Sequence, residues 1–258
     1  MGKILIKTPD QIEGIKKSCH LTARTLDMIG QYVRPGVTTL ELDTIINTFI
    51  LSNGGVSADI NYLGNNKWGK GGYPRSTCIS LNDIICHGIP RADEVLKEGD
   101  ILNIDVSTIV DGYFGDASRM YTVGSISENA TKIISVTKRA WEIGIEQVRP
   151  GNFFGNIGYE IAKYAESQGC SVVREYTGHG VGVQFHEEPY VYHKADRNSG
   201  PKMQTGMVFT IEPMINLGKF ATKIDKDNWT VRTKDGSLSA QFEHTILVTE
   251  TGHTILTV

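Results

Sequence analysis

Residues 103–116 read NIDVSTIVDGYFGD, and three aspartates in this stretch surround a tight turn. Asp111 belongs to an Asp-Gly pair, which is typical of a two-residue β-hairpin loop. If this pair is the loop, Asp105 lies opposite Ser118, and Asp116 is its diagonal neighbour on the same face of the strand pair. The stretch therefore predicts a β-hairpin that carries two acids on one face.

The face that carries these two acids has two interpretations. In the first, one side of the hairpin is buried and the other is wet. The buried side would hold Leu102, Ile104, Val106 and Val110, and the wet side Asn103, Asp105 and Ser107. In the second, a cation lies between the carboxylates and turns their repulsion into shared coordination. The hairpin alone leaves both interpretations open.

The composition excludes several classes of protein. The chain has 258 residues, 40% of them hydrophobic, which is enough for one large domain or two small ones. Its net charge of −3 gives no sign of binding to DNA or to an anionic membrane, and no apolar run approaches the ~20 residues of a membrane span. The four cysteines form no Cys-x-x-Cys pair and no secretory signal is present, so we expect reduced thiols and a cytoplasmic location.

The tetrapeptide VRPG occurs at 33–36 and again at 148–151, each time between two predicted helices. The second helix of each pair is expected to end at a glycine, Gly54 in one case and Gly169 in the other. The repeated order of helix, VRPG, helix and glycine indicates an internal duplication.

Residues typical of helix N-caps indicate where the helices of the first half begin. Thr8, Pro9 and Gln11 supply an N-cap, a proline in the first turn and a capping-box glutamine. Thr38 and Glu41 form a second capping box after the first VRPG.

The predicted strands repeat as well. GDILNID at 99–105 is similar to GMVFTIE at 206–212, and this match aligns Asp105 with Glu212. YFGD at 113–116 is similar to QFE at 241–243, and this match aligns Asp116 with Glu243. Four acids in two matched pairs would converge across a pseudo-two-fold axis. Four uncompensated carboxylates in one interior site are too costly, and metal ions are the simplest compensation.

Three histidines lie in short motifs flanked by glycine. His179 and His186 belong to EYTGHGVGVQFHEEP, and His87 belongs to ICHGIP. The glycines suggest that backbone approaches a ligand closely there. Carboxylates with imidazole favour Mn²⁺, Fe²⁺, Co²⁺ or Zn²⁺ over a structural thiolate site. Two such ions, roughly 3.5–4 Å apart, can share bridging carboxylates and a nucleophilic water.

Four motifs of the chain resemble those of the type I methionine aminopeptidases, which have the pita-bread fold. They read NIDVSTIVDGYFGDASRMYTVG, YTGHGVGVQFHEEP, TIEPMI and SLSAQFEHTILVT. The resemblance runs from about residue 8 to the end of the chain and is specific. It implies an α+β fold with a central antiparallel sheet and helices packed outside. We expect a single catalytic domain over 1–258, with pseudo-repeats at about 8–124 and 125–258.

The resemblance also implies roles for particular residues. The metal ligands would be Asp105, Asp116, His179, Glu212 and Glu243, with Asp116 and Glu243 as bridges between two ions. Glu212 would also take up a proton and help pass it to the leaving amine, His186 would stabilise the oxyanion, and His87 would contact the scissile amide nitrogen. The methionine side chain would lie among Tyr62 or Tyr73, Cys78, Phe185 and Trp229, although Cys78 and Trp229 suit an ordinary core equally well.

The implied activity is removal of the N-terminal methionine from nascent proteins when the second residue is small. It needs two divalent ions per chain, of Co, Mn, Fe or Zn. The expected partners are N-terminal methionine peptides, with the ribosome as a candidate, and the enzyme is expected to be a monomer.

Two alternatives remain at this stage. An Xaa-Pro aminopeptidase usually has a further histidine four residues before the ligand histidine, where this chain has Glu175, and an additional N-terminal domain. A non-catalytic pita-bread protein that binds peptides loses ligands, whereas all five positions are filled here.

One segment departs from the family pattern. The stretch LGNNKWGK at 63–70 stands where type I enzymes commonly have only a residue or two. It is polar and rich in glycine, so we expect a loop beside the pocket, with Trp68 as either a substrate contact or an exposed side chain.

Overall fold

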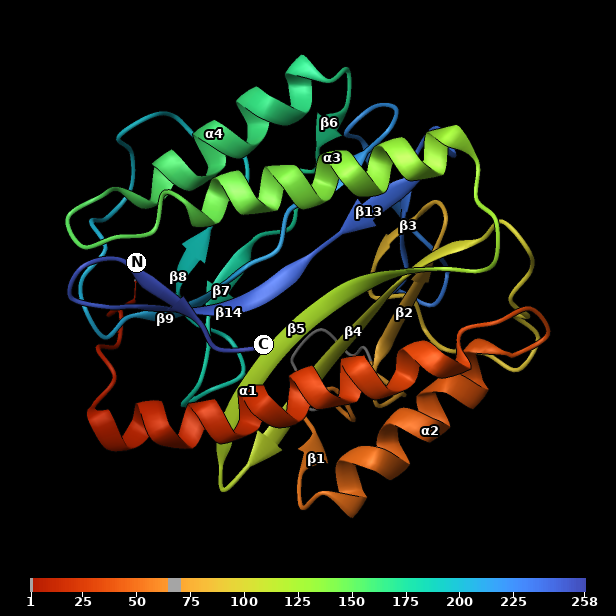
Figure 1. Cartoon of the computed structure of the whole chain (residues 1–258), viewed down its shortest axis with the longest axis horizontal. Helices are drawn as coiled ribbons and strands as arrows, with labels where there is room; N and C mark the ends of the chain where they lie inside the picture. The colour runs from red at the N-terminus through yellow and green to blue at the C-terminus, as the bar shows by residue number, and fades with distance from the viewer. Residues whose placement is uncertain (1, 65–70) are drawn as a thin grey trace.

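A computed structural model describes residues 2–64 and 71–258 of the chain. A curved antiparallel sheet lies in the middle, and four long helices cover one side of it in two pairs (Figure 1). The helices are α1 (Pro9–Ile29), α2 (Thr39–Ser52), α3 (Glu128–Ile145) and α4 (Phe154–Ser167), and a short 3₁₀ turn, η1 (Gly30–Tyr32), follows α1. Within the described residues, no helix is both long and apolar enough to cross a membrane.

The helix starts agree with the sequence caps. Thr8 caps α1 and forms the predicted box with Gln11, and Thr38 and Glu41 do the same for α2. The side chain of Ser127 caps α3 by accepting a hydrogen bond from the amide of Ala130. These capping predictions are confirmed because a cap depends on a few neighbouring residues and not on distant packing.

The main sheet has nine strands and unites the two halves of the chain. Its central path runs β1 (Val56–Ser57), β4 (Ile101–Val110), β5 (Tyr113–Thr122), β14 (Glu243–Val248), β9 (Val208–Ile211), β7 (Gly178–Gly180) and β8 (Glu187–Val191). Two more strands join it at its sides, β2 (Cys78–Leu81) on β4 and β15 (His253–Ile255) on β14. Because β14 pairs with both β5 and β9, this strand links the first half to the second (Figure 1).

Two small sheets complete the structure. One is β6 (Ser171–Val172), β10 (Met214–Asn216) and β13 (Ser239–Gln241), and the other is β3 (Ile84–Cys86), β11 (Thr222–Ile224) and β12 (Val231–Thr233).

The hairpin of β4 and β5 has the predicted register. Asp105 lies opposite Ser118, and the Asp-Gly pair forms the turn, with Asp111 and Gly112 both at positive φ. The wet-face interpretation is wrong, because Asn103 and Ser107 are each only 3% exposed. Helix α1 packs on one face of this hairpin, and the other face lines an internal cavity.

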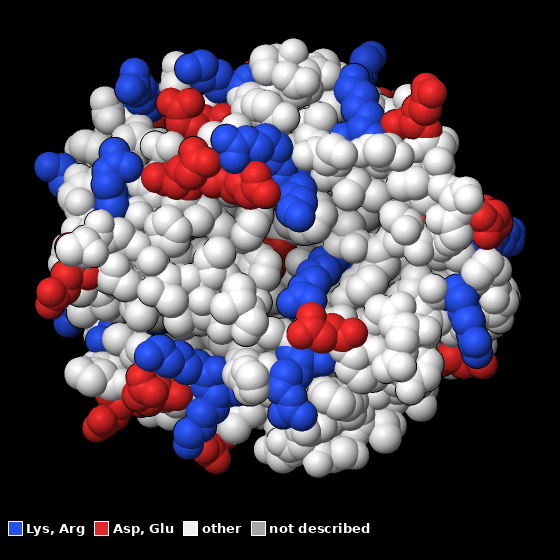
Figure 2. All heavy atoms as spheres, viewed as in Figure 1, with Lys and Arg blue, Asp and Glu red and all other residues white. Residues whose placement is uncertain are grey.

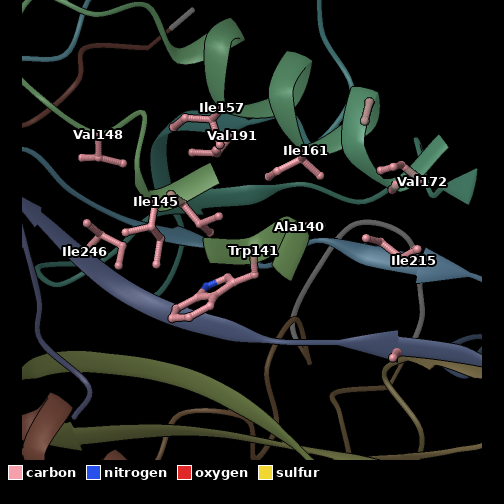
Figure 3. Packing of buried hydrophobic residues seen from close by; sticks show 14 of the residues in the cluster. Ala140, Trp141, Ile145, Val148, Ile157, Ile161, Val172, Val191, Ile215 and Ile246 are labelled. Atoms are coloured by element: carbon pink, nitrogen blue, oxygen red, sulfur yellow. The ribbon is translucent and has the colours of Figure 1, made fainter. Parts of the chain in front are cut away.

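Two large hydrophobic clusters lie beneath the two helix pairs. One joins α1 and α2 to the first-half strands through residues such as Leu26, Ile46 and Ile104. The other joins α3 and α4 to the second half, where Trp141 and Ile161 point toward the sheet (Figure 3). On the face shown in Figure 2, basic and acidic side chains are interspersed, in keeping with a net charge near zero.

The two helix pairs match in detail. Helices α2 and α4 both have 14 residues, and each ends two residues before a glycine at positive φ, Gly54 at 79° and Gly169 at 74°. The VRPG copies likewise end in glycines at positive φ, with Gly36 at 89° and Gly151 at 81°. These matches support the proposed duplication within one domain, which stays a prediction.

Candidate metal centre and active site

Five side chains that were predicted as metal ligands meet in one cavity of about 260 Å³. They are Asp105 on β4, Asp116 on β5, His179 on β7, Glu212 directly after β9, and Glu243 at the start of β14. The Nε2 atom of His179 lies 3.5 Å from Oδ2 of Asp116 and 3.7 Å from Oε1 of Glu212. Asp116, His179 and Glu243 offer ligand atoms that all lie within 4.8 Å of one another.

These acidic side chains are buried close together, so their carboxylate charges need a counter-charge. Removal from water and the neighbouring acids raise the pKa of Asp105 and of Glu243 well above their usual range. Burial likewise raises the pKa of Glu212 to about 7. Oδ1 of Asp105 is buried and has no hydrogen-bond partner among the described residues. An unpartnered carboxylate oxygen in a cluster of carboxylates fits a divalent cation.

Neighbouring polar groups fix the orientation of the proposed ligands. Ser107 donates to Oδ1 of Asp116 at 2.8 Å, Thr210 donates to Oε1 of Glu212 at 2.6 Å, and Gln241 donates to Oε2 of Glu212 at 3.3 Å. Sequence reasoning missed all three. Each lies two residues from a proposed ligand, and side chains two residues apart on a strand point to the same face of the sheet. This spacing was the signal that could have found them.

The tautomer of His179 follows from its surroundings. Its Nδ1 lies 3.0 Å from the carbonyl oxygen of Gly180, which can only accept a hydrogen bond. Nδ1 therefore carries a proton, and in the neutral ring the lone pair of Nε2 is the one that a metal ion beside the acids would accept, as in many metal sites. Burial lowers the pKa of His179, but its hydrogen bond to Asp116 and the charge of Glu212 outweigh burial, so the net shift is upward.

The glycines around His179 have a different role from the one suggested by the sequence. A Cβ on Gly178 would lie 2.5 Å from the carbonyl oxygen of Thr210, and one on Gly180 would lie 2.3 Å from that of Glu188. They are required because β7 lies very close to its neighbouring strands. Gly88 is restricted in the same way by the carbonyl of Ile79, at 2.1 Å.

His87 and His186 both line the cavity without joining the acid cluster. The ring of His186 lies between those of His179 and Tyr62, with centroids 4.0 and 4.9 Å away. Burial lowers the pKa of His87 to about 4, and burial with the nearby histidines lowers that of His186 to about 2. Both imidazoles are therefore neutral at neutral pH.

The residues predicted for the methionine pocket line the same cavity. They are Tyr62, Tyr73, Cys78, Phe185 and Trp229. Tyr62 meets Phe185 edge to face at 4.9 Å, and Tyr73 meets Trp229 at 5.3 Å. The alternative prediction of Trp68 as a substrate contact falls outside the described residues, as does most of the 63–70 segment.

The loop that carries Phe185 and His186 is tied to the N-terminal segment by a buried ion pair. Oε1 of Glu187 accepts hydrogen bonds from the amides of Val183 and Gln184, both at 2.8 Å. Its other oxygen pairs with Lys7, and the two side chains are 3% and 1% exposed. This arrangement fixes the loop against the rest of the molecule.

Sequence reasoning also missed two buried groups near the site. The side chain of His193 accepts a hydrogen bond from the amide of Glu212 at 3.1 Å, which positions the backbone of that residue. Asp59 lines the cavity from the turn after β1. Neither residue belongs to a repeated or glycine-flanked motif, so no local pattern indicated it.

Comparisons with known proteins agree with this geometry. The model of metallopeptidase family M24 matches residues 13–250. The chain is 49% identical over 255 residues to a methionine aminopeptidase of Salmonella typhimurium and 48% identical to that of Escherichia coli K12, in each case covering 98% of this chain and 94% of the relative.

Solved structures are similar in fold. The crystal structure of methionine aminopeptidase from Rickettsia prowazekii matches with a TM-score of 0.94 and 46% identity, covering 99% of this chain and all of that one. Prolidase from Pyrococcus furiosus matches with a TM-score of 0.78 at 23% identity, over 65% of its length, which concerns the fold alone. These matches confirm the expected α+β pita-bread fold.

Proposed function

Because the chain belongs to metallopeptidase family M24, we propose that it is a metal-dependent aminopeptidase that releases methionine from the N-terminus of peptides. The observation that carries this proposal is that the acid and histidine cluster lines the same cavity as several aromatic rings. The rings offer an apolar site for one side chain, and the acids offer negative charge for a cation and for the α-ammonium group of the substrate.

The cluster supports the use of a divalent metal. We infer two ions, which would be held by Asp105, Asp116, His179, Glu212 and Glu243. The donor set of carboxylates and one imidazole suits Co²⁺, Mn²⁺, Fe²⁺ or Zn²⁺. When bound, such ions supply a nucleophilic water at neutral pH and polarise the carbonyl that is attacked.

Glu212 is suited to proton transfer. Its buried carboxyl lines the cavity within the acid cluster, which is where a general base must lie to take a proton from the attacking water. Thr210 and Gln241 each donate to one of its oxygens and hold the carboxylate in place. We assign Glu212 the uptake of a proton from the attacking water and its delivery to the leaving amine.

The two neutral histidines are suited to binding the scissile peptide group. A neutral imidazole donates a hydrogen bond without placing a competing positive charge beside the cations. We assign His186 to the carbonyl oxygen that becomes negative in the transition state, and His87 to the scissile amide nitrogen. The ring of His186 packs against that of His179 at an interplanar angle of 31°, which keeps it beside the cluster.

We place the second residue of the substrate beside the acid cluster, where His87, Thr177 and His179 line the cavity. The motifs that carry these residues resemble those of enzymes that accept only a small second residue. We therefore expect glycine, alanine or serine at the second position. N-terminal methionine peptides of nascent chains are the proposed substrates, and we place the enzyme in the cytoplasm as a monomer near ribosomes, where its four free, buried cysteines suit a reducing environment.

The proposal is tested by release of methionine from Met-Ala-Ser and Met-Leu-Ser peptides, together with metal analysis. We expect kcat/KM to be on the order of 10²-fold higher for Met-Ala-Ser, because a displacement of about 1 Å of the scissile carbonyl has that effect. Asp116→Ala should lose both metal and turnover. Asp111→Asn, in the exposed hairpin turn, is the matched control and should keep both.

Three results would contradict the proposal. They are equal kcat/KM for the two peptides, unchanged activity after exhaustive chelation, and preferential release of a residue other than methionine. Cleavage of Xaa-Pro peptides alone would favour the prolidase alternative. Tight peptide binding without turnover in the metal-loaded protein would favour the non-catalytic one.

A further inference from the structure

A second hollow lies beside the active-site cavity, and the proposed mechanism gives it no role. Its volume is about 610 Å³, and we call it the outer groove. Apolar and aromatic side chains make up most of its lining. They include Ile4, Phe154, Pro189, Tyr190, Tyr192 and Pro201.

Tyr190 joins the outer groove to the active-site cavity, because this residue lines both. On the paired strands β7 and β8, Tyr190 lies directly opposite His179. Residues opposite each other on antiparallel strands project from the same face of a sheet. Tyr190 therefore stands on the face that carries His179, and the outer groove adjoins the cavity on the side of the acid cluster.

Two tyrosines of the outer groove are largely exposed. Tyr190 is 56% exposed and Tyr192, two residues further along the chain, is 53% exposed. Aromatic side chains that share an exposed apolar patch are typical of a binding surface. Among the described residues that line the groove, Glu188 is the one with a charged side chain, and its Oε1 accepts a hydrogen bond from the amide of Gly2 at 2.9 Å. The groove thus fits an apolar partner better than a charged one.

We propose that the outer groove binds the substrate chain beyond its third residue, through apolar side chains at about the fifth and sixth positions. This inference rests on the proposed function. A peptide whose first residue lies at the acid cluster must leave the cavity over its rim, where Tyr190 leads into the groove. An extended chain advances about 3.3 Å per residue, so two residues span the distance from Tyr190 to Tyr192.

The position of the groove determines what it can change in the reaction. Contacts far from the reacting atoms stabilise the bound substrate and the transition state equally, so they lower KM and leave kcat unaltered. An unfolded chain exposes apolar side chains that a folded domain would bury. The groove would therefore favour chains that have not yet folded.

The experiment compares two peptides of equal length and charge on the metal-loaded full chain. They are Met-Ala-Ser-Gly-Leu-Leu-Gly-Gly and Met-Ala-Ser-Gly-Ser-Ser-Gly-Gly. The wild-type protein should prefer the leucine peptide by about 3–10-fold in kcat/KM, through KM alone, as partial burial of a leucine side chain in an open groove supplies. Tyr192→Ser should bring this ratio to near one and leave turnover of Met-Ala-Ser unchanged, whereas Tyr192→Phe should keep the ratio.

Tyr32→Ser is the matched control, because Tyr32 is 37% exposed and lines a different hollow. It should keep the full preference for the leucine peptide.

Four results separate this proposal from its rivals. Equal kcat/KM of the wild-type protein for the two peptides overturns it, as does a preference that survives Tyr192→Ser. Equal loss of turnover on all peptides in Tyr192→Ser means that the side chain is structural, which also overturns it. A dimer in sedimentation that Tyr192→Ser dissociates, with the peptide ratio unchanged, identifies the groove as a contact between two copies and overturns it too. Failure to release methionine even from Met-Ala-Ser would instead overturn the proposed function, and this inference with it.

Discussion

Replacement of Lys7 by methionine should destabilise the protein and disturb the loop that carries His186. The pair of Lys7 and Glu187 is almost fully buried, so Lys7→Met leaves a carboxylate without its counter-charge. Removal of one partner from a buried pair typically costs about 3–5 kcal/mol. Glu187 keeps two amide hydrogen bonds at 2.8 Å, which places the expected loss near the lower limit, at about 3 kcal/mol.

Denaturant and thermal unfolding measure this loss. For a domain of this size, about 3 kcal/mol corresponds to a decrease in Tm of roughly 6–12 °C. Lys16→Met is the matched control, because Lys16 pairs with Glu13 on the surface, with exposed fractions of 46% and 68%. Such exposed pairs contribute about 0–1 kcal/mol. Equal unfolding midpoints for Lys7→Met and Lys16→Met would refute the reasoning.

A double-mutant cycle separates the ion pair from general damage. Glu187→Gln leaves Lys7 buried beside a neutral amide and should destabilise by a similar amount. The double variant Lys7→Met with Glu187→Gln should be more stable than the sum of the single losses implies, because neither charge is then left unpaired. Simple additivity of the two losses would show that the side chains act independently. Turnover should fall with the single variants, since Phe185 and His186 lie within the loop that Glu187 fixes.

Three further predictions concern the site. His87→Ala and His186→Ala should keep bound metal yet lose about 10²–10³-fold in kcat, as expected for loss of a transition-state hydrogen bond; loss of metal from His186→Ala but not from His179→Ala would reverse the assignment. Loading with a divalent metal at 100 times its Kd should raise the free energy of unfolding by about 2.7 kcal/mol, measured as a Tm increase, and Glu243→Ala should abolish that increase. Burial lowers the pKa of His193 to about 3, from an ordinary value of 6.5, so the stabilising effect of the neutral ring is present above pH 6.5 and is lost on acidification toward pH 3; His193→Gln should reduce the pH dependence of unfolding by one proton in this range.

The features that the sequence predicted correctly depend on short stretches of chain. The Asp-Gly turn sets the register of the hairpin, and the caps at Thr8 and Thr38 need only three following residues. The acids were singled out because two pairs of similar stretches, GDILNID with GMVFTIE and YFGD with QFE, each end at or carry an acid. The prediction of a solvent-exposed face was wrong because the alternation of polar and apolar residues in β4 does not reveal distant contacts. Asn103 is covered by another strand, where it donates a hydrogen bond to the carbonyl oxygen of Gln241.

What the sequence could not show depends on contacts between distant residues. Lys7 and Glu187 are separated by 180 residues, and neither stands in a recognisable motif. Asp59 follows a two-residue strand in a turn, and nothing in the neighbouring sequence shows that it joins the wall of the cavity. The glycines beside His179 appeared to make room for a ligand, whereas the spacing of three strands requires them.

The position of β14 has a consequence for how the protein is made. This strand brings Glu243 to the site, and the contact between Asn103 and Gln241 beside it spans 138 residues. At the usual translation rate of about 5–20 residues per second, roughly 7–30 s separate the synthesis of the first acids from that of the last. Throughout this interval a ribosome-bound chain holds an incomplete set of ligands. We therefore expect metal to be acquired only after Glu243 has been synthesised, so that no shorter nascent copy can act on other nascent chains.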